Sequence, residues 1–127
     1  MLDKVIYETT ITNIGECAAE FLDQDMMVTF LDSCPLDFKE FCFLHSENLL
    51  SEDIRIDDSL YIDGNEFQVL GMGDVVNDNL DSLGHITISF IDIVPTPKMG
   101  GTLYVKKGSQ VNLSIGSKIT VKRRKNE

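Results

Sequence analysis

Apolar and polar residues alternate with a period of two along most of this chain, as they do in β-strands that bury one face. Residues 5–12 are rich in β-branched side chains, and residues 26–31 and 86–91 have the same character. Residues 41–45 form an apolar run that ends at a histidine. Shorter strands are expected at 60–62, 66–70, 102–105 and 119–121, with 111–115 as a weaker candidate. The pattern therefore predicts a sheet built from many short strands.

Turn-forming residues separate these strands, and helical periodicity is brief wherever it occurs. Asp63 and Gly64 lie between two apolar runs and favour a hairpin turn, in which both central residues adopt positive φ. The less regular segments are expected to be a short helix over 16–23, a helical turn over 36–40 and a polar loop over 74–84 anchored by Leu80 and Leu83. We therefore predict an all-β protein, a small closed or partly open β-barrel with one or two short helical segments, in which residues 1–127 form a single domain.

The charge balance argues against nucleic-acid partners and anionic membrane surfaces. The chain has 21 acidic and 11 basic residues, a formal net charge of -10, whereas phosphate-rich partners favour clustered Lys and Arg. The basic run at 122–125 is the exception, and we interpret it as a solubilising tail. The first residues do not have the pattern of a secretory leader, and no apolar run approaches the roughly 18 residues that span a bilayer. A cytoplasmic protein without membrane insertion is expected.

Metal and cofactor sites are not indicated by the residue spacing. The three cysteines, Cys17, Cys34 and Cys42, are odd in number and lack CxxC spacing, which favours reduced thiols over disulfides or a zinc site. Cys42 lies within the apolar run and is interpreted as a small buried side chain. The chain contains no HxH or HxxxH pair that would suit a metal, no Walker phosphate-binding loop and no GxSxG nucleophile motif. We therefore expect no metal and no cofactor.

The two histidines, His45 and His85, are the remaining candidates for chemistry. The ordinary pKa of imidazole, about 6.5, leaves its nucleophilic neutral form abundant near neutral pH. His85 opens an alternating run in which Thr87 and Ser89 share its side, so it is expected on a polar face. His45 shares its side with Phe43 in an aromatic patch, where it would be partly desolvated and close to a surface suited to docking another protein.

Several roles for this pair remain open on the residue pattern alone. Both are compatible with ordinary histidines, one at a strand end and one at the surface. Alternatively, one of them is a covalent nucleophile that carries a phosphoryl group. That role requires a ring nitrogen with a free lone pair, the other ring N–H held by an acceptor, an exposed approach and a nearby donor that offsets the phosphoryl charge. A second imidazole, or the hydroxyls of Thr87 and Ser89, could be this donor.

Four segments spread along the chain carry a specific pattern. They are YETTITNIG at 7–15, PLDFKEFCFLH at 35–45, GDVVNDNLDSLGHIT at 73–87 with Phe90 beyond it, and the weaker GTLYV at 101–105. In this order, and in a chain of this size, they resemble the glucitol/sorbitol-specific IIA component of the bacterial sugar phosphotransferase system. The alternative from another class is a non-catalytic β-barrel module that binds or regulates a partner.

The resemblance implies a cytoplasmic phosphocarrier with a β-barrel-like fold. His45 would accept a phosphoryl group from the histidine-containing phosphocarrier protein and pass it to a cysteine of the sugar-specific IIB component, which phosphorylates the hexitol during uptake through the IIB/IIC membrane components. His85 would stabilise or orient. Glu47 stands where some members carry another histidine, and a carboxylate facing the site would repel a phosphoryl group. A turn that begins at Ser46 is therefore expected.

A protein that exchanges phosphoryl groups with other proteins needs an accessible active group beside a docking surface. Phe41, Phe43 and Leu44 are expected either to form an apolar rim around His45 or to belong to the core. The acidic surface favours a partner that presents basic residues around its own phosphohistidine.

Overall fold

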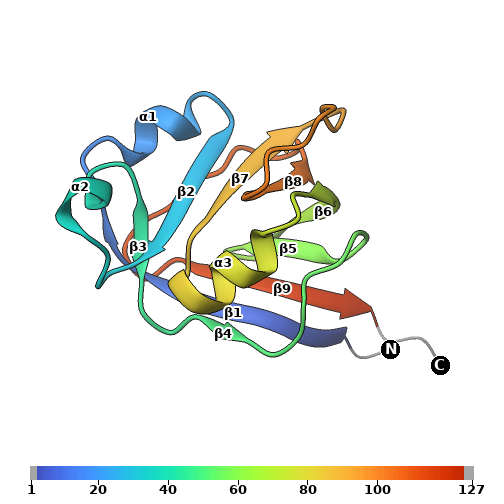
Figure 1. Cartoon of the computed structure of the whole chain (residues 1–127), viewed down its shortest axis with the longest axis horizontal. Helices are drawn as coiled ribbons and strands as arrows, with labels where there is room; N and C mark the ends of the chain where they lie inside the picture. The colour runs from blue at the N-terminus through green and yellow to red at the C-terminus, as the bar shows by residue number, and fades with distance from the viewer. Residues whose placement is uncertain (1–2, 125–127) are drawn as a thin grey trace.

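Nine strands form one sheet within the residues that the structure describes, 3–124. They are β1 (Asp3–Ile14), β2 (Met26–Leu31), β3 (Phe43–His45), β4 (Leu49–Leu50), β5 (Ser59–Ile62), β6 (Asn65–Met72), β7 (Ile86–Ile91), β8 (Thr102–Lys106) and β9 (Lys118–Arg124). In this computed structural model the strand order is β3-β2-β7-β8-β6-β5-β9-β1-β4, and an added β3–β1 pairing curls the sheet into a ring (Figure 1). The predicted all-β fold is confirmed, although the ring is not strictly a barrel.

Strand β1 closes the ring because it pairs along both edges. One edge pairs with β9 along most of its length. The other pairs with β4 at Tyr7 and Glu8, and with β3 from Ile11 to Ile14, with an irregularity in register between Ile11 and Asn13. Strand β3 therefore lies between β1, which runs antiparallel to it, and β2, which runs parallel. As a result His45, the last residue of β3, is flanked by a strand on each side.

The alternation predicted for β7 separates the inside of the ring from the outside. Ile86, Ile88 and Phe90 are buried in the main core, whereas Thr87 and Ser89 are partly exposed on the opposite face. The strand packs its β-branched and aromatic residues inward because burial of each such side chain stabilises the fold by roughly 1.5–3 kcal/mol. The two faces expected from the sequence are therefore confirmed.

A second, smaller core covers the outer face of β2 and β3. It consists of Phe30, Cys34, Cys42 and Leu44. Burial raises the pKa of the Cys42 thiol to about 11, so this thiol stays protonated at neutral pH and packs as a small apolar group. The interpretation of Cys42 as a buried side chain is confirmed. Strand β2 thus has a core on each of its faces.

Three short helices lie within the described residues: α1 (Ala18–Leu22), α2 (Leu36–Lys39) and α3 (Val76–Leu83). The first two fall in segments where helical turns were expected, but α3 corrects the polar loop expected at 74–84. Val76 and Leu80, four residues apart, are both buried on one face of the helix. Gly84 ends α3 in the left-handed conformation at a φ of 61°. Leu83, the second expected anchor, is exposed instead.

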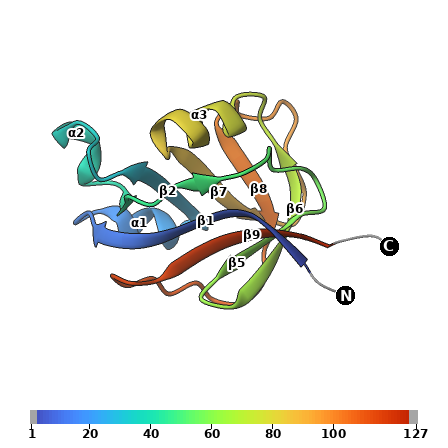
Figure 2. The same ribbon diagram turned by 90° about the horizontal axis from the view of Figure 1, so that it is seen from below.

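Helix α3 contacts β4 and β7 and covers one side of the ring, opposite β5 and β9 (Figure 2). Helices α1 and α2 lie together at one end of the molecule, beside β2 and β3 (Figure 1). Within the part of the chain that the structure describes, none of the helices is long and apolar enough to cross a bilayer.

The weaker strand candidate at 111–115 is wrong, because the chain there follows an irregular path. Val111 and Leu113 still pack partly against the main core. The backbone N–H of Ser114 donates to Ser117 Oγ at 2.9 Å and forms a turn before β9. The apolar alternation in this segment therefore reflects packing without strand pairing.

The basic run at 122–125 is part of the sheet as far as Arg124, so the expected solubilising tail is wrong for those residues. Arg123 Nε donates to Asp58 Oδ1 at 2.8 Å, and Arg123 Nη2 donates to Asp58 Oδ2 at 2.9 Å. Arg123 also pairs with Glu52 at 3.1 Å. These contacts fasten β9 to the segment before β5. Lys125 lies outside the described residues, as do Met1, Leu2 and the two last residues.

Asp58→Asn is expected to lower the free energy of unfolding by about 1–2 kcal/mol, because it removes the charge from a two-point ion pair while keeping the side-chain shape. Asp58 is buried and also accepts the backbone N–H of Arg55 at 2.8 Å. Urea denaturation at neutral pH measures the difference. Glu16→Gln, at an exposed carboxylate, is the matched control and should shift stability by less than about 0.5 kcal/mol. Equal effects for the two variants would contradict the prediction.

Candidate functional site

His45 is completely enclosed by the fold, with an exposed fraction of 0%. Its Nε2 lies 2.8 Å from the carbonyl oxygen of Gly84, and its Nδ1 lies 2.8 Å from Thr9 Oγ1. A carbonyl oxygen only accepts hydrogen bonds, so Nε2 carries the proton in the neutral ring. Nδ1 is then the acceptor for the Thr9 hydroxyl. Both nitrogens of His45 are therefore occupied.

A network behind Thr9 holds this arrangement in place. The backbone N–H of Asn48 donates to Thr9 Oγ1 at 3.2 Å, which leaves the Thr9 hydroxyl proton for His45. The Asn48 side chain accepts from Tyr7 Oη at 2.9 Å and donates to the Leu80 carbonyl at 2.9 Å. Burial raises the pKa of the Tyr7 hydroxyl, so Tyr7 remains a donor at any physiological pH. This network of hydrogen bonds thus fixes both the orientation and the tautomer of the His45 ring.

Burial also keeps His45 neutral. Loss of hydration lowers the pKa of the His45 imidazole below its ordinary value, and this effect outweighs the opposing contributions of the Gly84 carbonyl and the Asp32 carboxylate. A charged ring at this position would have to be desolvated without an ion-pair partner in contact. The neutral, doubly hydrogen-bonded ring is the form that suits this site.

His85 has the opposite environment. It directly precedes β7 and is partly exposed. Its Nδ1 lies 3.0 Å from the Thr29 carbonyl oxygen, so Nδ1 carries the proton and donates it to Thr29. The ring stacks on Phe30 with 4.2 Å between centroids and 24° between planes. Among the described residues Nε2 has no hydrogen-bond partner, and its lone pair is free.

The two rings do not face one another. In the parallel β2–β3 pair, His45 is aligned with Leu31 and lies on the inner side of the sheet, whereas His85 stacks on Phe30 on the outer side. Strand β2 passes between them. They are joined through Thr29 and Gly84: the Gly84 carbonyl accepts from both His45 Nε2 and Thr29 Oγ1, at 2.8 and 3.0 Å, and the Thr29 carbonyl accepts from His85.

The chain beyond His45 follows the expected turn. Strand β3 ends at His45, Ser46 forms a bend, and Glu47 is exposed. The Glu47 carboxylate therefore does not share the enclosed site of the His45 ring, and the expectation of a turn at Ser46 is confirmed.

Of the two alternatives expected for the apolar residues beside His45, the core role is confirmed for Phe43 and Leu44, which belong to the main and second cores, respectively. Because β3 is buried on both faces, these two side chains form no rim. Phe41 is 42% exposed, and its ring packs edge-on against that of Phe21 in α1. Phe38 of α2 is 48% exposed, and its ring lies 5.4 Å from that of Phe30, the ring on which His85 stacks.

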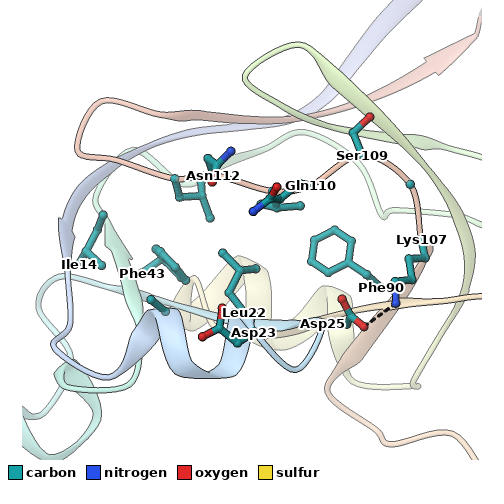
Figure 3. A pocket seen from close by; sticks show the side chains of 14 residues that line it. Ile14, Leu22, Asp23, Asp25, Phe43, Phe90, Lys107, Ser109, Gln110 and Asn112 are labelled. Carbon is teal, nitrogen blue, oxygen red and sulfur yellow. Dashed lines mark hydrogen bonds and ion pairs between the residues drawn. The ribbon is translucent and has the colours of Figure 1, made fainter.

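A separate hollow of about 500 Å³ lies between α1, the turn that precedes β2 and the segment 107–113 (Figure 3). Apolar side chains such as Leu22, Phe43 and Phe90 form its floor, and Lys107 pairs with Asp25 at its rim at 2.8 Å. Neither histidine lines this hollow. Within residues 3–124 no three His, Cys, Asp or Glu side chains are grouped so as to hold a metal ion.

Comparison with known proteins places this pair of histidines in a defined context. The profile of the family described as PTS system glucitol/sorbitol-specific IIA component matches residues 6–120, which include both rings and all their hydrogen-bond partners. The chain belongs to this family. The role of such a component in the phosphotransferase system supports a phosphotransferase role for the chain.

Two relatives by sequence and one solved structure are similar to this IIA component. It is 36% identical over 113 residues to the PTS system glucitol/sorbitol-specific EIIA components of Shigella flexneri and of Escherichia coli, with 89% of this chain and 91% of each relative covered. A solved structure of the PTS system IIA component from Enterococcus faecalis superposes with a TM-score of 0.79, covers 88% of this chain and 96% of its own, and is 22% identical. At that identity the match supports the fold alone.

Four residues that orient the histidines of this IIA component were not singled out by sequence reasoning. They are Thr9, Thr29, Asn48 and Gly84. Gly84 could have been found from the sequence, because a glycine directly before His85 permits a positive φ. That conformation brings the Gly84 carbonyl to the His45 ring. Thr29 had none, since its contact depends on β2 lying between β3 and β7.

Proposed function

We propose that this IIA component is a cytoplasmic phosphocarrier. It takes a phosphoryl group from the histidine-containing phosphocarrier protein onto one of its own histidines. It then passes the group to the IIB component of a glucitol/sorbitol transporter, whose membrane components take up and phosphorylate the sugar. Residues 1–127 act as one domain in this role, without a cofactor.

The observation that carries the proposal is a pair of imidazoles held in defined tautomers within a chain that belongs to this family. His85 has one ring N–H anchored on a backbone carbonyl and the other nitrogen free on a partly exposed face. A neutral imidazole held in this way presents its lone pair in one direction and remains in one tautomer. The His45 ring is held in the opposite tautomer by Gly84 and Thr9, so the tautomer of each ring is defined.

The chemistry requires only the exchange of one bond to phosphorus for another. A ring-nitrogen lone pair of this chain forms a bond to phosphorus while the N–P bond of the donor phosphohistidine breaks, and the bonding pair returns to the donor imidazole. In the second step a cysteine thiolate of the IIB component attacks phosphorus and the N–P bond to this chain breaks. No proton crosses in the first step, and no water is needed in either.

The resemblance names His45 as the acceptor, and that assignment stays a prediction. For His45 to react, the Thr9 hydroxyl would have to leave Nδ1, or the Gly84 carbonyl would have to leave Nε2. The strands beside the ring would also have to separate enough to admit a phosphoryl group. The acceptor within the pair is therefore a separate question from the carrier function itself.

Incubation of the protein with phosphoenolpyruvate, enzyme I and the phosphocarrier protein tests the function. We expect one phosphate per chain, stable in alkali and labile in acid, as measured by intact-mass spectrometry. The double variant His45→Gln with His85→Gln should take up none. Cys17→Ser, which leaves both rings intact, is the matched control and should be labelled as the wild type is. A folded wild-type protein that gains no phosphate would instead support the non-catalytic binding module.

A further inference from the structure

We infer that the surface formed by α2, the end of β2 and the end of α3 is the docking surface for the phosphoryl donor, a protein whose contact face has apolar side chains at its centre and basic ones around them. We call the exposed and partly exposed side chains of this surface the docking patch; they are Leu31, Leu36, Phe38, Leu83 and His85. The inference rests on the proposed phosphocarrier function, and it holds for either histidine as the acceptor.

Helix α2 presents apolar side chains that the rest of the chain does not cover. None of its four residues is buried, and the Leu36 side chain is 81% exposed. The Phe38 ring lies 5.4 Å from that of Phe30, which in turn stacks on His85 at 4.2 Å. Apolar side chains left in water do not contribute the roughly 1.5–3 kcal/mol that burial of each would provide. A group of them on one surface is typical of a site that binds another protein.

The docking patch continues from α2 to the other side of β2. In Figure 1 and Figure 2 the end of β2 lies between α2 and the C-terminal end of α3. Leu31, the last residue of β2, is partly exposed, and Leu83 near the end of α3 is exposed. The backbone of Gly84 connects these two elements, because a Cβ built on it would lie 2.8 Å from Leu31 Cγ. His85 follows directly and joins this part of the patch to the aromatic side chains.

The patch lies beside both histidine rings, although these rings are on opposite sides of β2. The His85 ring is partly exposed within it. The His45 ring is enclosed directly next to it: Leu31 is aligned with His45 in the β2–β3 pair, and a Cβ on Gly84 would lie 2.8 Å from His45 Cε1. Phosphoryl transfer requires the reacting nitrogen to lie in line with the donor N–P bond at close range. A donor protein must therefore dock at or beside this patch, whichever ring receives the group.

Carboxylates border the patch and indicate the charge of its partner. Asp32 follows the end of β2, Asp37 lies in α2, and Glu47 is exposed two residues beyond the end of β3. Lys39, in the last turn of α2, offsets only part of this charge. Opposite charges accelerate encounter and orient the two proteins, so the partner is expected to be basic around its phosphohistidine. A second copy of this chain, with its own net charge of -10, would be repelled.

The dependence of the labelling rate on donor concentration tests the apolar part of the patch. With the phosphorylated phosphocarrier protein as donor, the double variant Leu36→Ser with Leu83→Ser should need about 10-fold more donor for half-saturation, while the limiting rate changes by less than about 2-fold. Ile93→Ser is the matched control and should behave as the wild type does. Ile93 is 84% exposed and lies beyond the opposite end of β7 from His85. Circular dichroism and thermal unfolding show whether each variant is folded.

A charge reversal tests the acidic border. Asp37→Lys should raise the half-saturating donor concentration about 3- to 10-fold and should make it less sensitive to added salt. Asp92→Lys makes the same change of charge at an exposed carboxylate after β7, and it should leave both properties unchanged. Equal effects of the two reversals would mean that total charge, and not this border, governs the encounter, and would contradict the inference.

NMR of the wild type locates the contact without any variant. On titration with the unphosphorylated phosphocarrier protein, the amide signals of residues 36–38 and 83–85 should shift, and those of residues 92–94 should not. A labelled wild type whose docking variants keep the normal half-saturating concentration overturns the docking surface and leaves the carrier function standing. A wild type without any label overturns the carrier function itself.

Two further outcomes would assign the patch to a different occupant and overturn the inference. One is normal labelling of Leu36→Ser with Leu83→Ser combined with slower transfer to the IIB component, which would make the patch the contact for the second step. The other is a stable wild-type dimer in sedimentation that this double variant loses, which would make the patch a contact between two copies of the chain.

Discussion

Gly84→Ala is expected to lower the free energy of unfolding by about 3 kcal/mol and to slow phosphoryl transfer. Gly84 has a φ of 61°, a left-handed conformation that costs an alanine roughly 1–2 kcal/mol. The added Cβ would also lie 2.8 Å from His45 Cε1 and 2.8 Å from Leu31 Cγ. The His45 ring cannot move away without losing a hydrogen bond to Thr9 or to Gly84 itself, so overpacking adds roughly 1–3 kcal/mol.

Gly64→Ala is the matched control for this substitution. Gly64 also has a positive φ, 87°, but a Cβ there would meet nothing within 4 Å. Both variants restrict the unfolded chain in the same way, so that effect cancels in the comparison. Urea denaturation should show Gly84→Ala to be about 2 kcal/mol less stable than Gly64→Ala. Equal stabilities would mean that the His45 ring can move, which would contradict the fixed orientation expected from its two hydrogen bonds.

The alternation of apolar and polar residues was sufficient to predict which face of a single strand is buried and which is exposed. In β7, the alternation of Ile86, Ile88 and Phe90 with partly exposed residues follows directly from the period of two. The polar face of His85 was predicted in the same way. Reduced, buried Cys42 was also accessible to sequence reasoning, because it lies inside an apolar run.

The environment of His45 could not be predicted in this way, because it depends on which strands lie beside β3. A histidine at the end of an apolar run is partly exposed if the strand is at an edge, and enclosed if the strand is central. Here β1 and β2 flank it, and the decisive contact partners, Thr9 and Gly84, are 36 and 39 residues away in sequence. Helix α3 escaped prediction for a different reason: it is short, and only Val76 and Leu80 are buried.

The opposite environments of the two rings explain why a family pattern alone does not identify a nucleophile. A histidine that receives a phosphoryl group and a histidine that orients the backbone next to it are both expected to be retained in related chains. The two rings differ in hydrogen bonding: both nitrogens of His45 have partners, whereas His85 has a partner at Nδ1 alone among the described residues. The distinction depends on tertiary contacts that sequence does not display.

The second large effect is a loss of stability in mild acid that originates from His45. Because burial lowers the pKa of this imidazole in the folded protein, the unfolded chain binds more protons than the folded one between that lowered value and about 6.5. The contribution of His45 to the free energy of unfolding is therefore fully present above about pH 6.5. It decreases as the pH falls through this window, by at most about 1.4 kcal/mol per pH unit.

Urea denaturation of the wild type and of His45→Gln between pH 7.5 and pH 5 measures this linkage, with pH values chosen so that most carboxylates remain ionised. His45→Gln should be less stable than the wild type at pH 7.5, because a glutamine fills the ring cavity incompletely. The difference between the two proteins should shrink toward pH 5, since glutamine does not titrate. His85→Gln keeps the buried ring and should retain the acid sensitivity that His45 causes. A constant difference between wild type and His45→Gln across the whole range would mean that His45 titrates alike in the folded and unfolded chains. Burial would then not lower the pKa of the His45 imidazole in the folded protein.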